Sequence, residues 1–412
     1  MRILLAVSMV PQADGLGAIP KLLHAQLLGL RERHQVTVVG SYGDLPGQAE
    51  AARELMGAGD IAAHFADRRR SSSPRRRWRV RAELASAWAT KGWPWRAVSA
   101  TGGVQAMVDR AAAEGPFDVV ALEEDLMSVL RLPTGAPVVL TEHEAFQASE
   151  KGWKAMRLRE RPEMWLRRRD WARWAEFRRS AWERADLVQV YSDGDAEAIA
   201  GAAPELASRV RVNPFGLVPP AAADPAAEAA GTILFSGTFT HLPNREAALW
   251  LAEEILPAVR AREPGATLRI VGSAPPAEIR GLAGPGIEVI ADAPSMEPHL
   301  QAAAVVVAPV RSGGGMRMKV LEAMARGKAV VTTPLGAEGF NSIDPEPPLA
   351  LADDSEGIAA ALAELLGDEP ERRELGRRAR EFTLRHHSPE AWAERLEAVY
   401  EEARTAGRGG SR

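Results

Sequence analysis

The chain has 412 residues, more than a single hydrophobic core usually serves, so we expect two domains. Hydrophobic residues make up 46 % and charged residues 26 %, which is ordinary for a globular protein, and the formal net charge of −4 argues against bulk binding of nucleic acid. With no cysteine, the chain has no disulfide framework, no thiolate metal site and no cysteine nucleophile.

The N-terminal apolar run at residues 3–7 is too short for a secretion signal and is predicted to form a first buried strand. No stretch of the chain approaches the roughly 20 apolar residues that a membrane-spanning helix needs. We therefore expect a cytoplasmic protein, with peripheral contact at the inner face of a membrane left open.

A strand-helix-strand unit of Rossmann type opens the chain. After the first strand, apolar residues from Ile19 to Leu30 recur at helical spacing, and residues 36–39 form a second strand. Gly15 and Gly17 lie in the loop before this helix. A tight turn would explain these two glycines as well as a binding loop would.

Residues 68–81 are dominated by arginine and serine. Such a run cannot bury itself, so the simplest prediction is a solvated surface or mobile loop. The alternative is attraction to an anionic acceptor or to anionic lipid, worth about 1 kcal/mol per basic residue near a charged membrane. The nearby tryptophans Trp78, Trp88, Trp93 and Trp95 favour this alternative.

Polar clusters follow two short apolar strands, at residues 119–122 and 137–141. In an open parallel sheet the ligand crevice lies beyond the carboxyl ends of the strands, so these clusters are predicted to point toward it. His143 is the main candidate there, although a lone histidine is more often structural than catalytic. Glu124, Glu142 and Glu144 are weaker candidates for orienting an acceptor hydroxyl.

The middle of the chain is predicted to hold a long helix at residues 165–186, whose aromatic stripe is expected to pack in the core. A strand at residues 187–191 follows, with Ser192 or Asp193 capping the next helix. Proline and alanine are frequent at residues 213–227, as at a domain junction. A strand at residues 233–236 begins the second half, and Asn244 is predicted to cap a helix that runs to Arg260.

Residues 305–339 combine a buried strand, three glycines, a helix and a second strand. Glycines let the backbone approach an anion closely, and the amides at a helix N-terminus point toward it. Arg317 and Lys319 add positive charge in the first turn, and Glu322 could accept hydrogen bonds from a ribose diol. The plainer interpretation is an ordinary strand-loop-helix turn with a solvated pair of cations.

The run from Gly315 to Gly327, followed by Gly336-Ala337-Glu338-Gly339, resembles the nucleotide-sugar site of glycosyltransferase family four. The resemblance implies an α/β fold of GT-B architecture, with two Rossmann-like domains facing across a cleft. Residues 1–215 would bind the acceptor and residues 216–385 the nucleotide sugar. Residues 386–412 would be a C-terminal helix returning to the N-terminal domain, ending in a frayed tail at residues 407–412.

The resemblance also implies roles for individual residues. His143, Arg317 and Lys319 would act in catalysis, with the two cations on the donor diphosphate. The donor would be bound by Gly15, Gly17, Gly237, Thr238, Ala293, Gly313, Gly314, Gly315, Met316 and Glu322. Two departures stand out: Gly314 takes the place of a glutamate that contacts the donor sugar in many members, and no lysine or arginine lies between Gly237 and Arg245.

These observations predict a retaining glycosyltransferase that moves a sugar from a nucleoside-diphosphate sugar to an unidentified acceptor hydroxyl. No metal or other cofactor is expected, because the glycine-loop amides, Arg317 and Lys319 would stabilise the leaving diphosphate. Two alternatives stay open. A sugar-nucleotide epimerase would need acid/base carboxylates such as Glu124, Glu142 or Glu144, and a catalytically silent nucleotide-sugar-binding subunit is indicated by Gly314.

Overall fold

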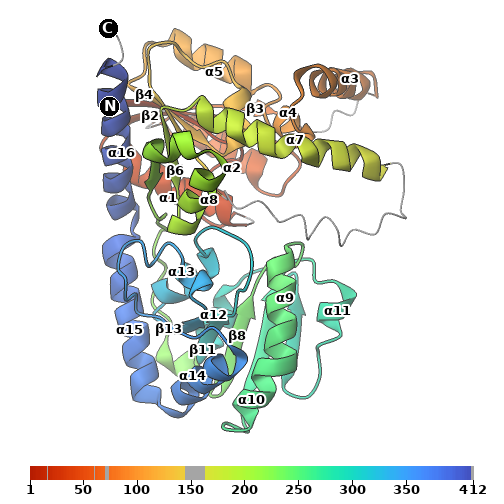
Figure 1. The fold of residues 1–412 in the computed structure, drawn as a ribbon, viewed down its shortest axis with the longest axis vertical. Coiled ribbons are helices and arrows are strands. Elements are labelled where there is room, and N and C mark those ends of the chain that lie inside the picture. Colours follow the sequence, from red (N-terminus) through yellow and green to blue (C-terminus); the bar gives the residue numbers. More distant parts are fainter. Residues whose placement is uncertain (16, 60, 70–73, 144–162, 410–412) are drawn as a thin grey trace. The chain divides into compact units, whose positions relative to one another are not determined.

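The chain forms two compact α/β units in the structure, a computed structural model that describes residues 1–15, 17–59, 61–69, 74–143 and 163–409. The first unit comprises Met1–Gly216 and Pro389–Arg412, and the second comprises Leu217–Ser388. Each unit is built on a parallel sheet with helices packed on it (Figure 1). This architecture confirms the predicted fold class of two Rossmann-like domains.

The described residues of the first unit hold a seven-stranded sheet in the order β3-β2-β1-β4-β5-β6-β7. Its strands are β1 (Arg2–Ala6), β2 (Gln35–Tyr42), β3 (Ala62–Asp67), β4 (Val119–Glu123), β5 (Val138–Thr141), β6 (Leu187–Val190) and β7 (Val210–Val212). The direction of strand order reverses between β1 and β4, which pair directly. In sheets of this kind ligands bind beyond the carboxyl ends of the strands at the point of reversal.

The helices of the first unit cover this sheet. They are α1 (Ala18–Arg31), α2 (Gln48–Gly57), α3 (Pro74–Lys91), α4 (Trp95–Ala100), α5 (Val104–Ala113), η1 (Asp125–Val129), α7 (Glu163–Glu183), α8 (Asp193–Ala202), η2 (Pro204–Arg209) and α16 (Pro389–Gly409). Phe177 of α7 is buried, as the aromatic stripe predicted. Ser192 caps α8 by accepting a hydrogen bond from the Asp195 amide, which confirms the predicted helix start.

The last helix, α16, packs on the first unit, as predicted. Its side chains Trp392, Leu396 and Tyr400 are fully buried, and the helix lies against α1. Asp118 connects the first strand to the last helix. It accepts a hydrogen bond from the Arg2 amide at 2.8 Å and forms an ion pair with Arg404 of α16 at 3.4 Å. The start of β1 and the C-terminal part of α16 therefore lie close together in the first unit.

Two expectations for the first unit were wrong in part. The basic segment was expected to be a loop, but residues 74–81 belong to α3, because arginine is a good helix former. Residues 70–73 lie outside the described part of the chain, and Trp78 of α3 is 75 % exposed. The C-terminal tail was expected to fray from residue 407, but α16 continues to Gly409.

The second unit repeats the same topology with six strands in its described residues, in the order β10-β9-β8-β11-β12-β13. The strands are β8 (Thr232–Ser236), β9 (Thr267–Gly272), β10 (Ile287–Ala291), β11 (Val305–Ala308), β12 (Ala329–Thr332) and β13 (Ala350–Leu351). β8 and β11 are neighbours, so the strand order reverses between them. The loops that follow β8 and β11 therefore meet at the expected ligand-binding edge.

The helices of the second unit are η3 (Pro225–Ala227), α9 (Leu242–Trp250), the π-helical turn η4 (Leu251–Ile255), α10 (Leu256–Arg260), α11 (Ala277–Arg280), α12 (Glu297–Ala302), α13 (Met318–Ala325), η5 (Leu335–Ala337), α14 (Ser355–Gly367) and α15 (Glu369–His386). The predicted cap of α9 was wrong. The helix begins at Leu242, with Pro243 tolerated in its first turn, and Asn244 lies inside it.

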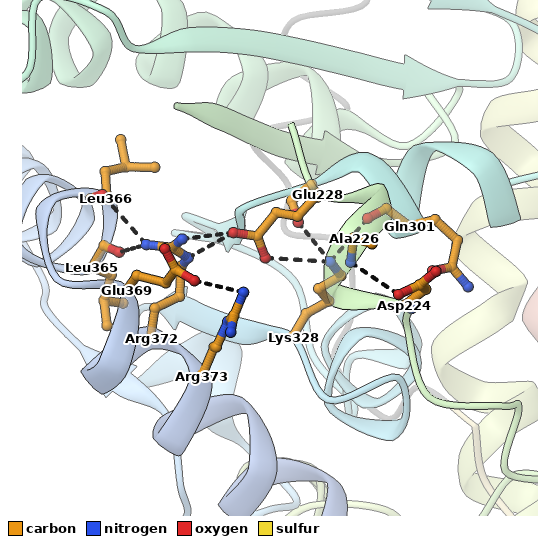
Figure 2. Close-up of polar contacts among 11 residues, drawn as sticks. Asp224, Ala226, Glu228, Gln301, Lys328, Leu365, Leu366, Glu369, Arg372 and Arg373 are labelled. Atoms are coloured by element: carbon orange, nitrogen blue, oxygen red, sulfur yellow. Dashed lines mark hydrogen bonds and ion pairs between the residues drawn. The ribbon is translucent and has the colours of Figure 1, made fainter. Parts of the chain in front are cut away.

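A buried ionic cluster in the second unit ties the segment before β8 to β12 and α15 (Figure 2). Glu228 accepts from Arg372 Nη2 at 2.6 Å and lies 3.7 Å from Lys328 Nζ. Lys328 also donates to the carbonyl oxygens of Gln301 and Ala303. Buried charges cost free energy unless each is paired and hydrogen-bonded, so moving one of these segments would leave a buried charge without its partner. The cluster therefore favours this one arrangement of the segments.

In the part of the chain that the structure describes, none of the helices combines the length and the apolar character that crossing a bilayer requires.

Candidate functional site

The loop between β11 and α13 has a backbone that depends on its glycines. Gly313 and Gly315 have φ angles of +92° and +77°, a region that residues with a side chain rarely adopt. The chain then enters α13 at Met318, with Arg317 as the residue before the helix. The first amide groups of α13 have no partner within the helix, and they give this end a partial positive charge.

Arg317 braces this loop. Its guanidinium donates from Nη2 to the carbonyl oxygen of Gly313 at 3.1 Å, and from Nη1 to that of Gly314. These contacts hold the backbone of the glycine loop in place. The predicted contact of Arg317 with a diphosphate stays a prediction.

Lys319 lies one residue inside α13 and reaches toward β8. Its Nζ donates a hydrogen bond to Asn244 Oδ1 at 2.6 Å and lies 4.6 Å from the centre of the Phe235 ring. None of the ion pairs found among the described residues involves Lys319. Burial, and next the charge of Arg317, lower the pKa of Lys319 to about 7. An anion bound near Lys319 would favour the charged form of this lysine and raise its pKa.

One face of α9 holds the glycine loop, a feature that the sequence analysis missed. Ser312 Oγ donates to Glu246 Oε2 at 2.7 Å, and the Arg311 guanidinium stacks 4.1 Å from the Trp250 ring centre. A side chain at Gly313 would meet Pro243 at 3.3 Å. Positions 243, 246 and 250 lie on one face of a helix. Their spacing in the sequence could therefore have indicated that this face contacts another segment.

The loop after β8 lies close to the same place. A Cβ atom on Gly237 would lie 2.8 Å from Asn244 Cγ, so a side chain at position 237 would force Asn244 to move. The Thr238 carbonyl oxygen accepts from Asn244 Nδ2 at 2.9 Å. The structure thus brings Gly237 and Thr238 together with Lys319, through Asn244.

The loop after β10 contains Ala293, which is partly buried. Asp292 and Ala274, in neighbouring loops, both have a φ of +51°, which is unusual for residues that carry a side chain. Asp292 Oδ1 accepts from the Ala274 amide at 2.8 Å and so stabilises both loops. Such strain is often found at functional sites.

Four other predicted donor residues are Met316 and Glu322 in the second unit and Gly15 and Gly17 in the first. Met316 is buried below the glycine loop, and Glu322 is partly buried on α13. Gly15 and Gly17 belong to the first unit, in the loop between β1 and α1. A Cβ on Gly15 would lie 2.5 Å from Pro20, whereas Gly17 has a φ of +88° and open space around it.

His143 lies after β5 in the first unit and is held by a glutamate. Its Nε2 is 3.1 Å from Glu123 Oε2, and its ring centre is 5.4 Å from that of Tyr191. Glu123 is fully buried at the end of β4, where Oε1 also accepts from Gln26 and Thr141. Burial alone would lower the pKa of His143, but the hydrogen bond to Glu123 and the surrounding carboxylates raise it above the ordinary value.

The described carboxylates beside His143 are more buried than we expected of residues that orient an acceptor. Glu142 was considered for orienting an acceptor, but it is buried and accepts a hydrogen bond from Trp182 Nε1 at 2.9 Å. Burial, and next the charge of Asp125, raise the pKa of Glu142 to about 8. Glu124 is 8 % exposed, with its carboxylate 3.8 Å from Arg96. Glu144 lies outside the described residues.

A cavity of about 420 Å³ in the second unit lies away from these residues. It is lined by the segment around Pro347 and by α15, including Arg378 and Phe382. No predicted site residue borders it, so the candidate site rests on the loops and not on this cavity.

Comparison with protein families gives a match to the second unit. Residues 230–368, which contain β8 and the whole glycine loop, match the family described as glycosyl transferases group 1. The match supports a group 1 glycosyltransferase. No curated protein matches the sequence.

Solved structures of similar fold cover nearly the whole chain. A sucrose-phosphate synthase from Thermosynechococcus elongatus is 19 % identical, with a TM-score of 0.63 over 98 % of this chain and 99 % of that one. The HepE protein of Anabaena, solved with UDP and glucose, is 13 % identical, with a TM-score of 0.63 over 98 % and 100 % of the chains. The N-terminal domain of Candida albicans trehalose-6-phosphate phosphatase is 12 % identical, with a TM-score of 0.65 over 98 % and 97 %. At these identities the likeness shows the fold alone, which is the two-domain GT-B fold.

Proposed function

We propose that the protein is a retaining, metal-independent glycosyltransferase of family four that takes a nucleoside-diphosphate sugar as donor. The observation that carries the proposal is the position of Lys319. Its ammonium lies where the β8 and β11 loops meet, beside a glycine loop and a helix N-terminus. The HepE protein has been solved with UDP and glucose and with UDP-glucose, which agrees with such a donor.

In this proposal the second unit stabilises the leaving diphosphate. Amides of Gly313 to Gly315 and the Lys319 ammonium would take up the charge that develops on the phosphate oxygen. Glu322 would bind the ribose, and Arg317 would keep the glycine loop in its binding conformation. The loop of Ala293 would border the nucleobase.

The transfer step would proceed on one face of the sugar. The acceptor oxygen forms a bond to the anomeric carbon as the bond to the diphosphate oxygen breaks. The departing diphosphate accepts the proton of the acceptor hydroxyl. His143, whose pKa is raised by its hydrogen bond to Glu123 and by the surrounding carboxylates, stays the candidate of the first unit for catalysis.

The epimerase alternative loses support from the first unit. It would need carboxylates able to exchange protons with a substrate, but Glu142 is buried against Trp182. The silent binding subunit would bind a donor without hydrolysing or transferring it, so donor turnover measured with a range of acceptors separates it from the transferase.

The first test is calorimetric binding of UDP, GDP and ADP, without a divalent metal, to the wild type and to Glu322→Ala. We expect one nucleotide to bind, and Glu322→Ala to weaken it by about tenfold, as for the loss of a hydrogen bond to a charged group. Glu364→Ala, on an exposed position of α14, is the matched control and is expected to leave the affinity unchanged. If no nucleotide binds the wild type, or Glu322→Ala behaves like the control, the proposed donor site is wrong.

A further inference from the structure

The loop after β8 lacks a cation of its own. Residues 237–244 contain no lysine or arginine, and the guanidinium of Arg245 is engaged by Glu278 at 2.7 Å. A diphosphate near the Gly237 backbone would therefore meet no positive side chain from this loop. Lys319, 75 residues further along the chain, is the cation that arrives there.

Asn244 is the residue that connects Lys319 to this loop. Its side-chain oxygen accepts from Lys319 Nζ at 2.6 Å, while its side-chain nitrogen donates to the Thr238 carbonyl oxygen at 2.9 Å. The amide is thus held at both ends, and its Cγ lies against Gly237. Because Asn244 lies in the first turn of α9, its backbone is also fixed.

The chemistry of an amide suits this place. A carboxylate at position 244 would pair with Lys319 and cancel the charge that an anionic ligand needs. An amide oxygen accepts the hydrogen bond but has no net charge, so it does not compete with an anionic ligand for the ammonium. The Phe235 ring below Lys319 adds a contact of the cation–π type.

We propose that Asn244 is a positioning residue that aims the Lys319 ammonium at the diphosphate of the donor. This inference rests on the proposed donor site. It assigns Asn244 a role in ligand affinity, and not only in the start of α9.

The test is a double-mutant cycle. Wild type, Asn244→Ala, Lys319→Met and the double variant are titrated in turn with UDP-glucose, GDP-mannose and ADP-glucose by calorimetry at pH 6.5. We expect Asn244→Ala to weaken the donor that binds by about tenfold, as for a lost hydrogen bond to a charged group. In the Lys319→Met background, Asn244→Ala is expected to change nothing, because the group that it positions is gone.

Asn244→Asp supplies a readout that a purely structural role would not change. The aspartate keeps the shape of the side chain but pairs with Lys319 and keeps it protonated. We expect a weaker affinity than that of Asn244→Ala at pH 6.5, and an affinity that stays flat up to pH 9. Thermal unfolding of each variant checks that the unit remains folded.

The outcomes separate the two proposals. If no nucleotide sugar binds the wild type, the proposed function is wrong, and the positioning role of Asn244 is wrong with it. If the wild type binds but Asn244→Ala costs the same affinity with and without Lys319, Asn244 acts only on the fold of its loop. That result would overturn the positioning role and leave the donor site standing.

Discussion

The affinity of the protein for its nucleoside-diphosphate sugar is expected to fall as the pH rises above about 7, by roughly a hundredfold at pH 9. Lys319→Met is expected to give the weak affinity at every pH. Both effects arise from the same group, because the free protein releases the Lys319 proton near pH 7.

The direction follows from comparing the free and the bound protein. In the free protein, burial and the charge of Arg317 lower the pKa of Lys319 to about 7. A bound diphosphate raises that pKa, since opposite charges favour the ammonium. Affinity is therefore full below pH 7 and declines between the free and the bound pKa. The diphosphate of a nucleotide sugar is esterified at both ends, so it has no group that titrates in this range.

Calorimetry in two buffers of different ionisation enthalpy measures the proton that Lys319 takes up on binding. We expect close to one proton at pH 8 in the wild type and none in Lys319→Met. Lys319→Arg keeps its charge at all of these pH values, so it is the matched control and should bind without proton uptake. A wild-type affinity that stays flat from pH 6.5 to 9 would contradict the prediction.

Local patterns in the sequence were enough to predict many of the strands and helices, whereas the GT-B architecture was implied by the resemblance to a family. The strand, glycine loop and helix at residues 305–325 follow from short-range spacing, and the structure has them as β11 and α13. Ser192 was found for the same reason, because an N-cap acts only three residues away. Such signals need no knowledge of which segments meet.

Contacts between distant segments could not be predicted in this way. Asn244 looked like a helix cap, but its side chain is used by Lys319, and nothing near residue 244 announces that partner. Glu123 was not among the predicted candidates, whereas the pairing of β4 with β5 places it beside His143. In both cases the partner of a polar side chain is determined by which segments the fold brings together.

Glu142 shows the same limit with an energetic consequence. Its place after a strand predicted a residue facing a ligand, but its carboxyl group points to Trp182 in the core. Burying a carboxylate costs free energy unless the group stays protonated, and burial indeed raises the pKa of Glu142 to about 8. The chain therefore carries a pH-dependent cost at this residue.

Glu142→Gln is expected to stabilise the first unit at pH 8 by on the order of 2 to 4 kcal/mol, with little change at pH 5. The unfolded chain releases the Glu142 proton near its ordinary pKa of 4.5, whereas the folded protein keeps it until about pH 8. Stability is therefore full below pH 4.5 and is lost as the pH rises toward 8. Glutamine does not titrate, and its side-chain oxygen can still accept from Trp182.

Urea unfolding at pH 5, 6.5 and 8 measures this difference as a shift in the transition midpoint. Glu183→Gln on α7 is the matched control, because Glu183 is exposed and pairs only at the surface with Arg179. Its stability is expected to follow the wild type at each pH. If the midpoints of Glu142→Gln and the wild type instead differ by the same amount at every pH, Glu142 is ionised in the folded protein. Arg178 and Trp182 must then stabilise the charge of Glu142 by more than burial destabilises it.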